Sequence, residues 1–452
     1  AEILFELGYA VQGSDISDNP NVRRLRDKGI YVVIGQTKEN IKNATLVVIS
    51  SAIKPDNPEV VAARAKFLPI VHRAEMLGEL MRLRWAIAVA GTHGKTTTTA
   101  LVTHLMDELG LEPGFLLGGV AKNFGSGYRL CSQPGGPFVV EGDEYDTAFF
   151  DKGPKFLHYR PSVAVLNNIE FDHADIYDDL DEIIENFDRL MDLMVEGSTL
   201  IANLDDPLVV ERSKRAKGAV HSFGLSDTAR VRASHLTPFA GGVRFELSVD
   251  GTSIGQVTSP MSGTHNVSNV LAAFAVCEVY GASYPDLIKA LVSFKGTDKR
   301  QEEKGTYDGV LIVDDFAHHP TAIHTTLDGL KQRYGQRRIW AVYEPKSNTA
   351  RRNIHQTAYE TAFLPADQVL IATPYQKDDG LAAEDMLDVH LLTTRLTEAG
   401  TPASSPGDAE AIRHYLTTHA QAGDVVVVMA NSGFGGLIPK LVSDLSQRAK
   451  SS

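Results

Sequence analysis

Residues 84–97 read Arg84-Trp85-Ala86-Ile87-Ala88-Val89-Ala90-Gly91-Thr92-His93-Gly94-Lys95-Thr96-Thr97. The apolar run at 86–90 predicts a buried strand, and the following glycine-containing turn leads into a helix that reaches Leu109. Glycines let backbone N–H groups crowd an anion, and a helix N-terminus adds partial positive charge. The ammonium of Lys95 can then reach the β- and γ-phosphates of a nucleotide, and the Thr96 hydroxyl can bind Mg²⁺.

The match to a phosphate-binding loop is not literal, because the strict pattern has glycine where this chain has Val89. The competing interpretation is a plain strand-to-helix turn with a basic residue. Since strand, turn and helix occur in the required order, we predict that the loop binds a nucleoside triphosphate. The predicted contacts are Gly91, Thr92, His93, Gly94, Lys95, Thr96 and Thr97.

The composition excludes several classes of protein. A chain of 452 residues with 43% hydrophobic residues needs more than one core. The net charge of −13 argues against a general binder of nucleic acid or anionic membranes, and no apolar stretch approaches the length of a membrane span. Cys131 and Cys277 are too few for a disulfide framework or a cysteine-based zinc site. With no signal peptide at the start, we expect a cytoplasmic protein.

We predict an α/β fold of three domains. Residues 1–84 form a Rossmann-like domain that is incomplete at its N-terminus, because residues 1–9 read as the end of a helix whose preceding strand and glycine turn are missing. Residues 85–300 form the P-loop domain, with a mostly parallel sheet of continuous apolar strands. Between about 219 and 260 the hydrophobicity alternates around Asp250-Gly251, which predicts an antiparallel patch with a hairpin.

The third domain, residues 301–452, alternates strands with helices and is again Rossmann-like. Within it, residues 401–407 are rich in proline and serine and predict a loop. His318 and His319 form an adjacent pair, but their loop has no third ligand at a sensible spacing, so we assign no zinc site there.

Polar residues follow two neighbouring strands of the central domain. Residues 141–146, Glu-Gly-Asp-Glu-Tyr-Asp, come directly after the strand 138–140, and His173 lies among carboxylates after the strand 163–166. Ligands bind at the carboxyl ends of parallel strands, carboxylates suit Mg²⁺, and a histidine among them suggests a second cation site. A solvated acidic loop is the alternative. Three strand ends that all carry such groups favour one shared site.

The helix that begins near residue 264 carries His265, Asn266 and Asn269 at its start. These side chains either read an adenine edge or cap the helix, and capping explains one of them well but not all three.

At this point the chain resembles the Mur ligases, the ATP-dependent amide ligases of bacterial cell-wall synthesis. The resemblance rests on Gly91–Thr96, Glu141, Asn168–His173, His265-Asn266 with Asn269, Arg300, and Asp314-Asp315. It implies a UDP-sugar-binding domain, an ATPase domain and a C-terminal domain that binds the incoming amine.

Within this family, four strings resemble the branch that joins the tripeptide L-Ala-γ-D-Glu-meso-diaminopimelate to UDP-N-acetylmuramate in peptidoglycan recycling. They are residues 144–152, 171–176, 314–323 and 344–349. Residues 21–26 are more like the branch that adds L-alanine to the same sugar nucleotide. We therefore expect the tripeptide reaction, with L-alanine as the alternative amine and the oligomeric state left open.

The resemblance also implies roles for individual residues. Lys95 would stabilise the transferring γ-phosphoryl group, Thr96 and Glu141 would hold one Mg²⁺, and His173 would bind a second. Further ATP contacts would come from Asn266, Asn269, Arg300 and Asp315. The peptide would contact Lys346, Ser347, Asn348, Thr349 and Ser432, although residues 346–352 also fit a basic surface turn and the glycines near 432 a loose turn.

Two rival classes of protein remain. A nucleotide-binding switch or motor would hydrolyse ATP without any sugar nucleotide. A dinucleotide-binding redox protein is disfavoured because no G-x-G-x-x-G fingerprint follows a strand near either end.

Overall fold

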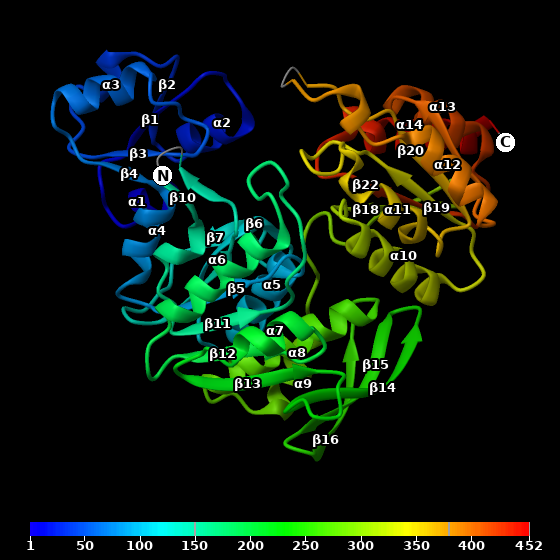
Figure 1. Cartoon of the computed structure of the whole chain (residues 1–452), viewed down its shortest axis with the longest axis horizontal. Coiled ribbons are helices and arrows are strands. Elements are labelled where there is room, and N and C mark those ends of the chain that lie inside the picture. Colours follow the sequence, from blue (N-terminus) through cyan, green and yellow to red (C-terminus); the bar gives the residue numbers. More distant parts are fainter. Residues whose placement is uncertain (149–150, 378–379, 452) are drawn as a thin grey trace.

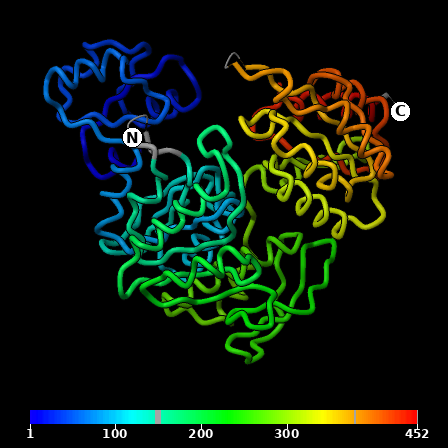
Figure 2. The backbone as a smooth tube through the Cα atoms, viewed as in Figure 1, coloured from blue at the N-terminus to red at the C-terminus, as the bar shows by residue number. Residues whose placement is uncertain are grey.

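The computed structural model describes residues 1–148, 151–377 and 380–451. The chain forms three α/β domains, with the N-terminal and C-terminal domains on the same side of the central one (Figure 1). The backbone passes through them in order, so its two ends lie in different domains (Figure 2). Phe149 and Phe150 of the string 144–152 lie outside the described residues. Among the described residues, no helix is long and apolar enough to cross a bilayer.

The N-terminal domain holds two small parallel sheets, β1 with β2 and β3 with β4. Its elements are α1 (Glu2–Glu6), β1 (Gln12–Asp15), α2 (Pro20–Asp27), β2 (Tyr31–Ile34), β3 (Val47–Ile49), α3 (Pro58–Ala65), β4 (Ile70–His72) and α4 (Arg73–Met81). Local sequence defines the starts of its helices. The Asn19 side chain accepts hydrogen bonds from the N–H groups of Asn21 and Val22, and Pro20 occupies the first helical position of α2.

The central domain is built on one large sheet with the order β16-β15-β14-β13-β12-β11-β5-β8-β6-β7. Its strands are β5 (Trp85–Ala90), β6 (Gly114–Ala121), β7 (Ser126–Arg129), β8 (Pro137–Gly142), β11 (Val163–Leu166), β12 (Thr199–Asn203), β13 (Ala219–Gly224), β14 (Val231–Phe239), β15 (Gly242–Val249) and β16 (Thr252–Ser259), and β9 (Asp146–Ala148) pairs separately with β10 (Asp151–Pro154). Its helices are α5 (Lys95–Glu108), α6 (Leu180–Leu193), α7 (Pro207–Ser213), α8 (Thr264–Val279) and α9 (Tyr284–Leu291).

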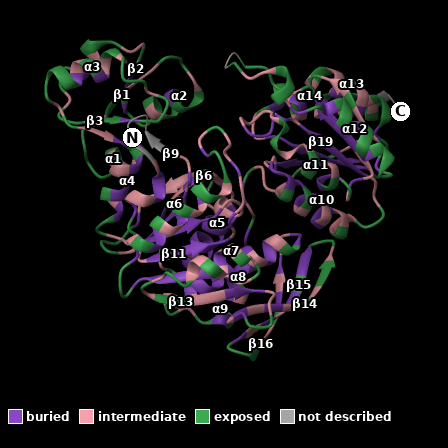
Figure 3. Cartoon of the chain, in the orientation of Figure 1, coloured by how far each residue is buried: buried purple, intermediate pink, exposed green. Residues whose placement is uncertain are grey.

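Both faces of the sheet are covered by helices, which explains the continuous apolar run of β5. Ile87 and Val89 belong to the core beneath α5, α8 and α9, whereas Ala88 and Ala90 belong to the opposite core beneath α4 and α6. The strand β5 and its neighbours in the sheet lie in the buried centre of the domain (Figure 3). A strand buried on both faces has no polar side, so its sequence does not alternate.

The strands β8, β5 and β11 are parallel neighbours whose carboxyl ends meet at one edge of the sheet. Ala90, the last residue of β5, lies opposite Gly142 of β8 and Leu166 of β11. The phosphate-binding loop and the two polar segments therefore leave the sheet side by side, as the sequence predicts.

The antiparallel patch comprises β14, β15 and β16. The predicted hairpin is confirmed, since Asp250 and Gly251 join β15 to β16 with φ angles of +48° and +75°. The predicted start at about residue 219 is wrong, because β13 still pairs in parallel with β12 and the antiparallel part begins at Val231.

The C-terminal sheet has the order β17-β18-β22-β19-β20-β21 and is parallel except for β17. Its strands are β17 (Glu302–Tyr307), β18 (Val310–Asp315), β19 (Ile339–Tyr343), β20 (Gln368–Ala372), β21 (Ala403–Gly407) and β22 (Val425–Met429). Its helices are α10 (Pro320–Tyr334), α11 (Gln356–Ala362), α12 (Val389–Glu398), α13 (Ala409–His419) and α14 (Leu437–Ser451). The helices α10, α11 and α12 cover one face, and α13 and α14 cover the other.

The loop predicted at residues 401–407 is wrong, because Ala403–Gly407 forms the edge strand β21. Its backbone pairs with β20, placing Ala403 opposite Val369. An edge strand tolerates Pro406, since proline lacks only a donor that the sheet does not need on its open side. Pairing with β20 overrides the low strand propensity of this segment.

Asp424, at the start of β22, supports a stability prediction. Its buried carboxylate accepts hydrogen bonds from the Arg338 guanidinium at 2.6 Å, the Trp340 indole at 2.9 Å and the Gln421 backbone at 2.9 Å. Burial alone would raise the pKa of Asp424, but these partners outweigh it and lower the pKa below 3.8. The stabilisation is therefore complete above that pH and is lost as the pH falls through the lowered pKa.

We expect Asp424→Asn to reduce the free energy of unfolding at neutral pH by about 2–4 kcal/mol, because the Arg338 charge loses its partner. The difference from wild type should shrink in acid. Urea unfolding at several pH values measures both effects. The exposed carboxylate Asp18, which pairs with Arg23, provides the control, and Asp18→Asn should change little. Equal effects of the two substitutions would contradict the prediction.

Candidate active site

The turn between β5 and α5 requires glycine at both ends. Gly91 and Gly94 have φ angles of +124° and +83°. A Cβ atom on Gly94 would lie 2.6 Å from the Asn269 side-chain oxygen and 2.8 Å from the Asn167 amide nitrogen. The loop therefore combines left-handed backbone with close packing, which only glycine allows.

Lys95 begins α5 and points back over this turn. Its ammonium donates to the Gly91 carbonyl at 2.8 Å and to both carboxylate oxygens of Glu144 at 2.7 Å. Burial would lower the pKa of Lys95, but the charges of Glu144 and Asp143 outweigh it and raise the pKa. The group is a charged ammonium with only 13% of its side chain exposed, which is compatible with phosphate binding.

Glu141 closes the neighbouring strand β8. One carboxylate oxygen accepts the Thr96 hydroxyl at 3.0 Å and the other accepts the Gly118 N–H at 2.6 Å. Burial raises the pKa of Glu141 despite these two bonds and the charge of Lys95. A hydroxyl and a carboxylate in contact are hard oxygen donors, so this pair fits Mg²⁺.

His173 lies beyond β11 in a left-handed conformation, with φ of +58°. Its Nε2 lies 3.1 Å from Glu144 Oε1, and its ring packs 4.3 Å from the Tyr145 ring. Burial would lower the pKa of His173, but the carboxylates of Glu144 and Asp172 raise it. Glu144 thus contacts both Lys95 and His173, which joins the ends of the strands into one site.

Sequence reasoning included Glu144 in the acidic segment but gave it no role. The structure makes it the central anion of the site, with only 2% of its surface exposed. In the sequence, Glu144 is marked only by its position after a strand, and Asp143 and Asp146 have the same position.

The start of α8 carries a connected chain of amides. The Thr98 hydroxyl donates to Asn269 at 3.0 Å, Asn269 donates to Asn266 at 3.1 Å, and Asn266 donates to the Ser262 carbonyl at 2.8 Å. The residue that caps the helix is Gly263, so neither asparagine is the N-cap. Burial lowers the pKa of His265 to about 4, so this ring is neutral at physiological pH. Asn269 therefore contacts α5, whereas Asn266 hydrogen-bonds to the turn that precedes α8.

Arg300 and Asp315 lie where the chain enters the C-terminal domain. The carboxylate of Asp315 is buried and accepts the backbone N–H groups of Gln301 at 2.7 Å and Ala317 at 2.8 Å. Arg300 lies over the Phe316 ring at 4.9 Å. Asp315 therefore fixes the backbone on both sides of the point where the chain enters the C-terminal domain, next to Arg300.

The residues predicted to bind the peptide fall into two groups. The Thr349 hydroxyl accepts the Ala174 N–H at 3.0 Å and Asn348 donates to Asp175 at 2.8 Å, so both touch the segment that carries His173. Lys346 donates to the Ser432 hydroxyl at 3.3 Å, and Ser432 donates to Glu344 at 2.5 Å. Ser347 is used locally, accepting the Ala350 N–H at 3.0 Å.

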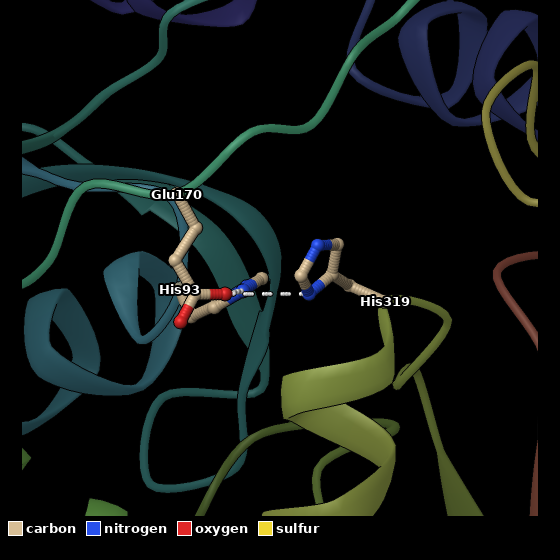
Figure 4. A group of neighbouring side chains, drawn as sticks. All are labelled: His93, Glu170 and His319. Atoms are coloured by element: carbon tan, nitrogen blue, oxygen red, sulfur yellow. Dashed lines mark hydrogen bonds and ion pairs between the residues drawn. The ribbon is translucent and has the colours of Figure 1, made fainter. Parts of the chain in front are cut away.

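A separate cluster, which the sequence did not predict, involves His93 of the phosphate-binding loop. His93 Nε2 lies 2.9 Å from Glu170 Oε2, and His319 Nδ1 lies 3.4 Å from the same oxygen (Figure 4). The loop of His318 and His319 offers no third metal ligand, but in the structure His319 lies beside His93 and Glu170, which come from the central domain.

This arrangement defines a class: a three-domain ATP-dependent ligase with a P-loop at the carboxyl edge of its central sheet. The chain belongs to the Mur ligase family. The Mur ligase middle domain matches residues 89–277, the Mur ligase family catalytic domain matches residues 1–85, and the Mur ligase glutamate ligase domain matches residues 299–432.

The similar proteins that align with nearly the whole of this chain are named for two different ligase reactions. The chain is 36% identical to the UDP-N-acetylmuramate–L-alanyl-gamma-D-glutamyl-meso-2,6-diaminoheptandioate ligase of Escherichia coli, covering 100% of this chain and 96% of that protein. It is 37% identical to the UDP-N-acetylmuramate–L-alanine ligase of Rhodospirillum centenum, covering 98% and 91%. The solved murein peptide ligase of Psychrobacter arcticus is 32% identical with a TM-score of 0.71, covering 98% of this chain and 95% of that chain.

Proposed function

We propose that this chain joins the tripeptide L-Ala-γ-D-Glu-meso-diaminopimelate to the lactyl carboxylate of UDP-N-acetylmuramate, with ATP and Mg²⁺. The observation that carries the proposal is the contact of Asn348 and Thr349 with the segment 173–175. This contact brings the C-terminal domain, the proposed amine-binding domain, to the edge of the sheet that holds the phosphate-binding loop.

The chemistry follows from the charges of the site. A carboxylate is a poor acyl donor, so an oxygen of the lactyl carboxylate attacks the γ-phosphorus of ATP and ADP leaves. The buried ammonium of Lys95 stabilises the transferring phosphoryl group. One Mg²⁺ held by Thr96 and Glu141, and a second held by His173, would neutralise charge on the phosphate oxygens. On ATP binding, Lys95 exchanges the Glu144 carboxylate for phosphate oxygens.

The second half of the reaction uses the C-terminal domain. The free α-amine of the tripeptide attacks the acyl carbon, and phosphate leaves with the oxygen that came from the carboxylate. Closure of the C-terminal domain over this edge would exclude water, which would otherwise hydrolyse the acyl phosphate. We assign Asn269, which contacts Thr98 of α5, together with Asn266, Arg300 and Asp315 to the ATP site.

The choice of the tripeptide over L-alanine is supported by Lys346 and Ser432. Lys346 is a partly exposed cation that lies beside the Ser432 hydroxyl and 3.7 Å from the Glu344 carboxylate. The distal carboxylates of a tripeptide match a cation and a hydroxyl. The curated relatives named as L-alanine ligases favour the alternative amine.

We expect Lys346→Ala to raise the KM for the tripeptide at least about tenfold, because one charge-assisted contact is lost. The KM for ATP should stay the same. Lys440, an exposed lysine of α14 that pairs with Glu410, offers a matched control, and Lys440→Ala should leave both values unchanged. Steady-state kinetics with each substrate varied in turn provides the measurement. An unchanged tripeptide KM would remove Lys346 from the amine site.

The proposed function is tested by amine-dependent ADP release. Purified protein, Mg²⁺, ATP and UDP-N-acetylmuramate are combined with tripeptide, with L-alanine or with no amine. The proposal predicts ADP release and amide formation with the tripeptide only. Release with L-alanine only would assign the alanine-adding reaction, and release that needs neither sugar nor amine would identify a nucleotide hydrolase.

A further inference from the structure

The cluster of His93, Glu170 and His319 joins two domains at one point. His93 belongs to the phosphate-binding loop, Glu170 follows β11, and His319 precedes α10 of the C-terminal domain. The candidate ligand atoms of these three side chains all lie within 4.8 Å of one another. Figure 4 shows the Glu170 carboxylate beside His93, with His319 facing both from the start of α10.

The hydrogen bonds of His319 leave its Nδ1 unprotonated. Its Nε2 lies 3.2 Å from the Phe171 carbonyl, which only accepts, so Nε2 carries the proton. The Nδ1 atom accepts a long bond of 3.3 Å from the Thr321 N–H. A nitrogen that accepts a backbone N–H carries no proton of its own, so the ring is neutral.

Two acceptors therefore lie close together. The Nδ1 atom of His319, which accepts the Thr321 N–H, lies 3.4 Å from the Glu170 carboxylate oxygen with no proton between them. Two acceptors at this distance repel, and a cation between them converts the repulsion into attraction.

We propose that His93, Glu170 and His319 bind one Zn²⁺ ion, which links the phosphate-binding loop to the C-terminal domain. Two imidazole nitrogens and one carboxylate are a ligand set that zinc prefers and that Mg²⁺ does not. Zinc ligands at about 2.0–2.1 Å in a tetrahedron lie about 3.3 Å apart, close to the separations of 2.9 and 3.4 Å measured here. The fourth position stays open to water or to a substrate oxygen.

This ion is separate from the Mg²⁺ of the proposed reaction. The Mg²⁺ set of Thr96 and Glu141 is built on oxygen donors and shares no residue with the cluster of His93, Glu170 and His319. The inference rests on the geometry of the cluster and does not depend on the proposed function, so a metal-binding assay tests it without any turnover.

Co²⁺ replaces Zn²⁺ as the spectroscopic probe, titrated into the full chain with Mg²⁺ in large excess to fill oxygen sites. We expect one Co²⁺ per chain, displaced by Zn²⁺, with the strong visible bands of a four- or five-coordinate ion. His319→Ala and Glu170→Gln should each weaken the affinity for Co²⁺ at least about a hundredfold. Loss of a residue that only hydrogen-bonds to a metal ligand already costs about 10–100-fold, and loss of a ligand itself costs more.

His324 offers a matched control, because it is an exposed histidine on the same helix as His319. His324→Ala should leave the Co²⁺ spectrum and affinity unchanged. Thermal unfolding followed by circular dichroism establishes whether each variant is folded. If His319→Ala does not fold, Glu170→Gln alone tests the proposal. Weak six-coordinate bands in wild type, or a spectrum and affinity that survive His319→Ala or Glu170→Gln unchanged, would overturn the proposal.

Discussion

Lys95→Ala should reduce ATP-dependent amide formation at least about 10³-fold, the largest effect that the structure predicts. The ammonium is buried against Glu144 at 2.7 Å, so its charge acts on the phosphoryl group with little screening by water. Removal of one charge that stabilises a transferring phosphoryl group costs about this factor or more. The rate of tripeptide-dependent ADP release at saturating ATP measures it.

The control for Lys95→Ala is a second change at its partner. Loss of Lys95 leaves the buried carboxylate of Glu144 without its cation, which destabilises the fold as well as the site. The double variant Lys95→Ala/Glu144→Gln removes that charge, so its thermal unfolding should return toward wild type while its activity stays low. Activity that recovers together with stability would show that Lys95 serves only the fold.

Glu141→Gln should lower kcat by about 10²–10³-fold and raise the Mg²⁺ concentration needed for half-maximal rate. Glutamine keeps an acceptor for the Thr96 hydroxyl or the Gly118 N–H but loses the negative charge that a cation needs. The matched control is Glu79→Gln on α4, where an exposed carboxylate pairs only with the neighbouring Arg82 among the described contacts.

The substitution Glu141→Gln should not destabilise the protein at neutral pH. Burial raises the pKa of Glu141 above 4.5, so wild type loses stability as the pH rises from that value through the raised pKa. Glutamine cannot ionise, and the variant should lack this loss. Chemical unfolding between acid and neutral pH measures it. A variant that loses stability in parallel with activity would contradict a functional role for this carboxylate.

The parts of the fold that the sequence predicted correctly are those specified by neighbouring residues. The loop Gly91–Gly94 follows its strand and precedes its helix within a few residues, so local pattern and structure agree. The Asp250-Gly251 hairpin is equally local, since both residues adopt the positive φ angles that this turn requires.

The failures concern contacts between distant residues. The strand β21 has a loop-like sequence and exists because β20 supplies a partner. Glu144 could not be distinguished from Asp143 until the structure showed which carboxylate Lys95 and His173 share. His319 meets Glu170 across two domains, at a sequence separation that no motif spacing describes.

The central claim is that one site transfers the γ-phosphoryl group of ATP to a sugar-nucleotide carboxylate and then passes the acyl group to a peptide amine. UDP-N-acetylmuramate labelled with ¹⁸O in its lactyl carboxylate tests this directly, by mass spectrometry of the phosphate released with the tripeptide. If the carboxylate receives the phosphoryl group, each phosphate formed from fully labelled substrate carries one labelled oxygen. Unlabelled phosphate would mean that water receives the phosphoryl group, and would contradict an acyl-phosphate mechanism.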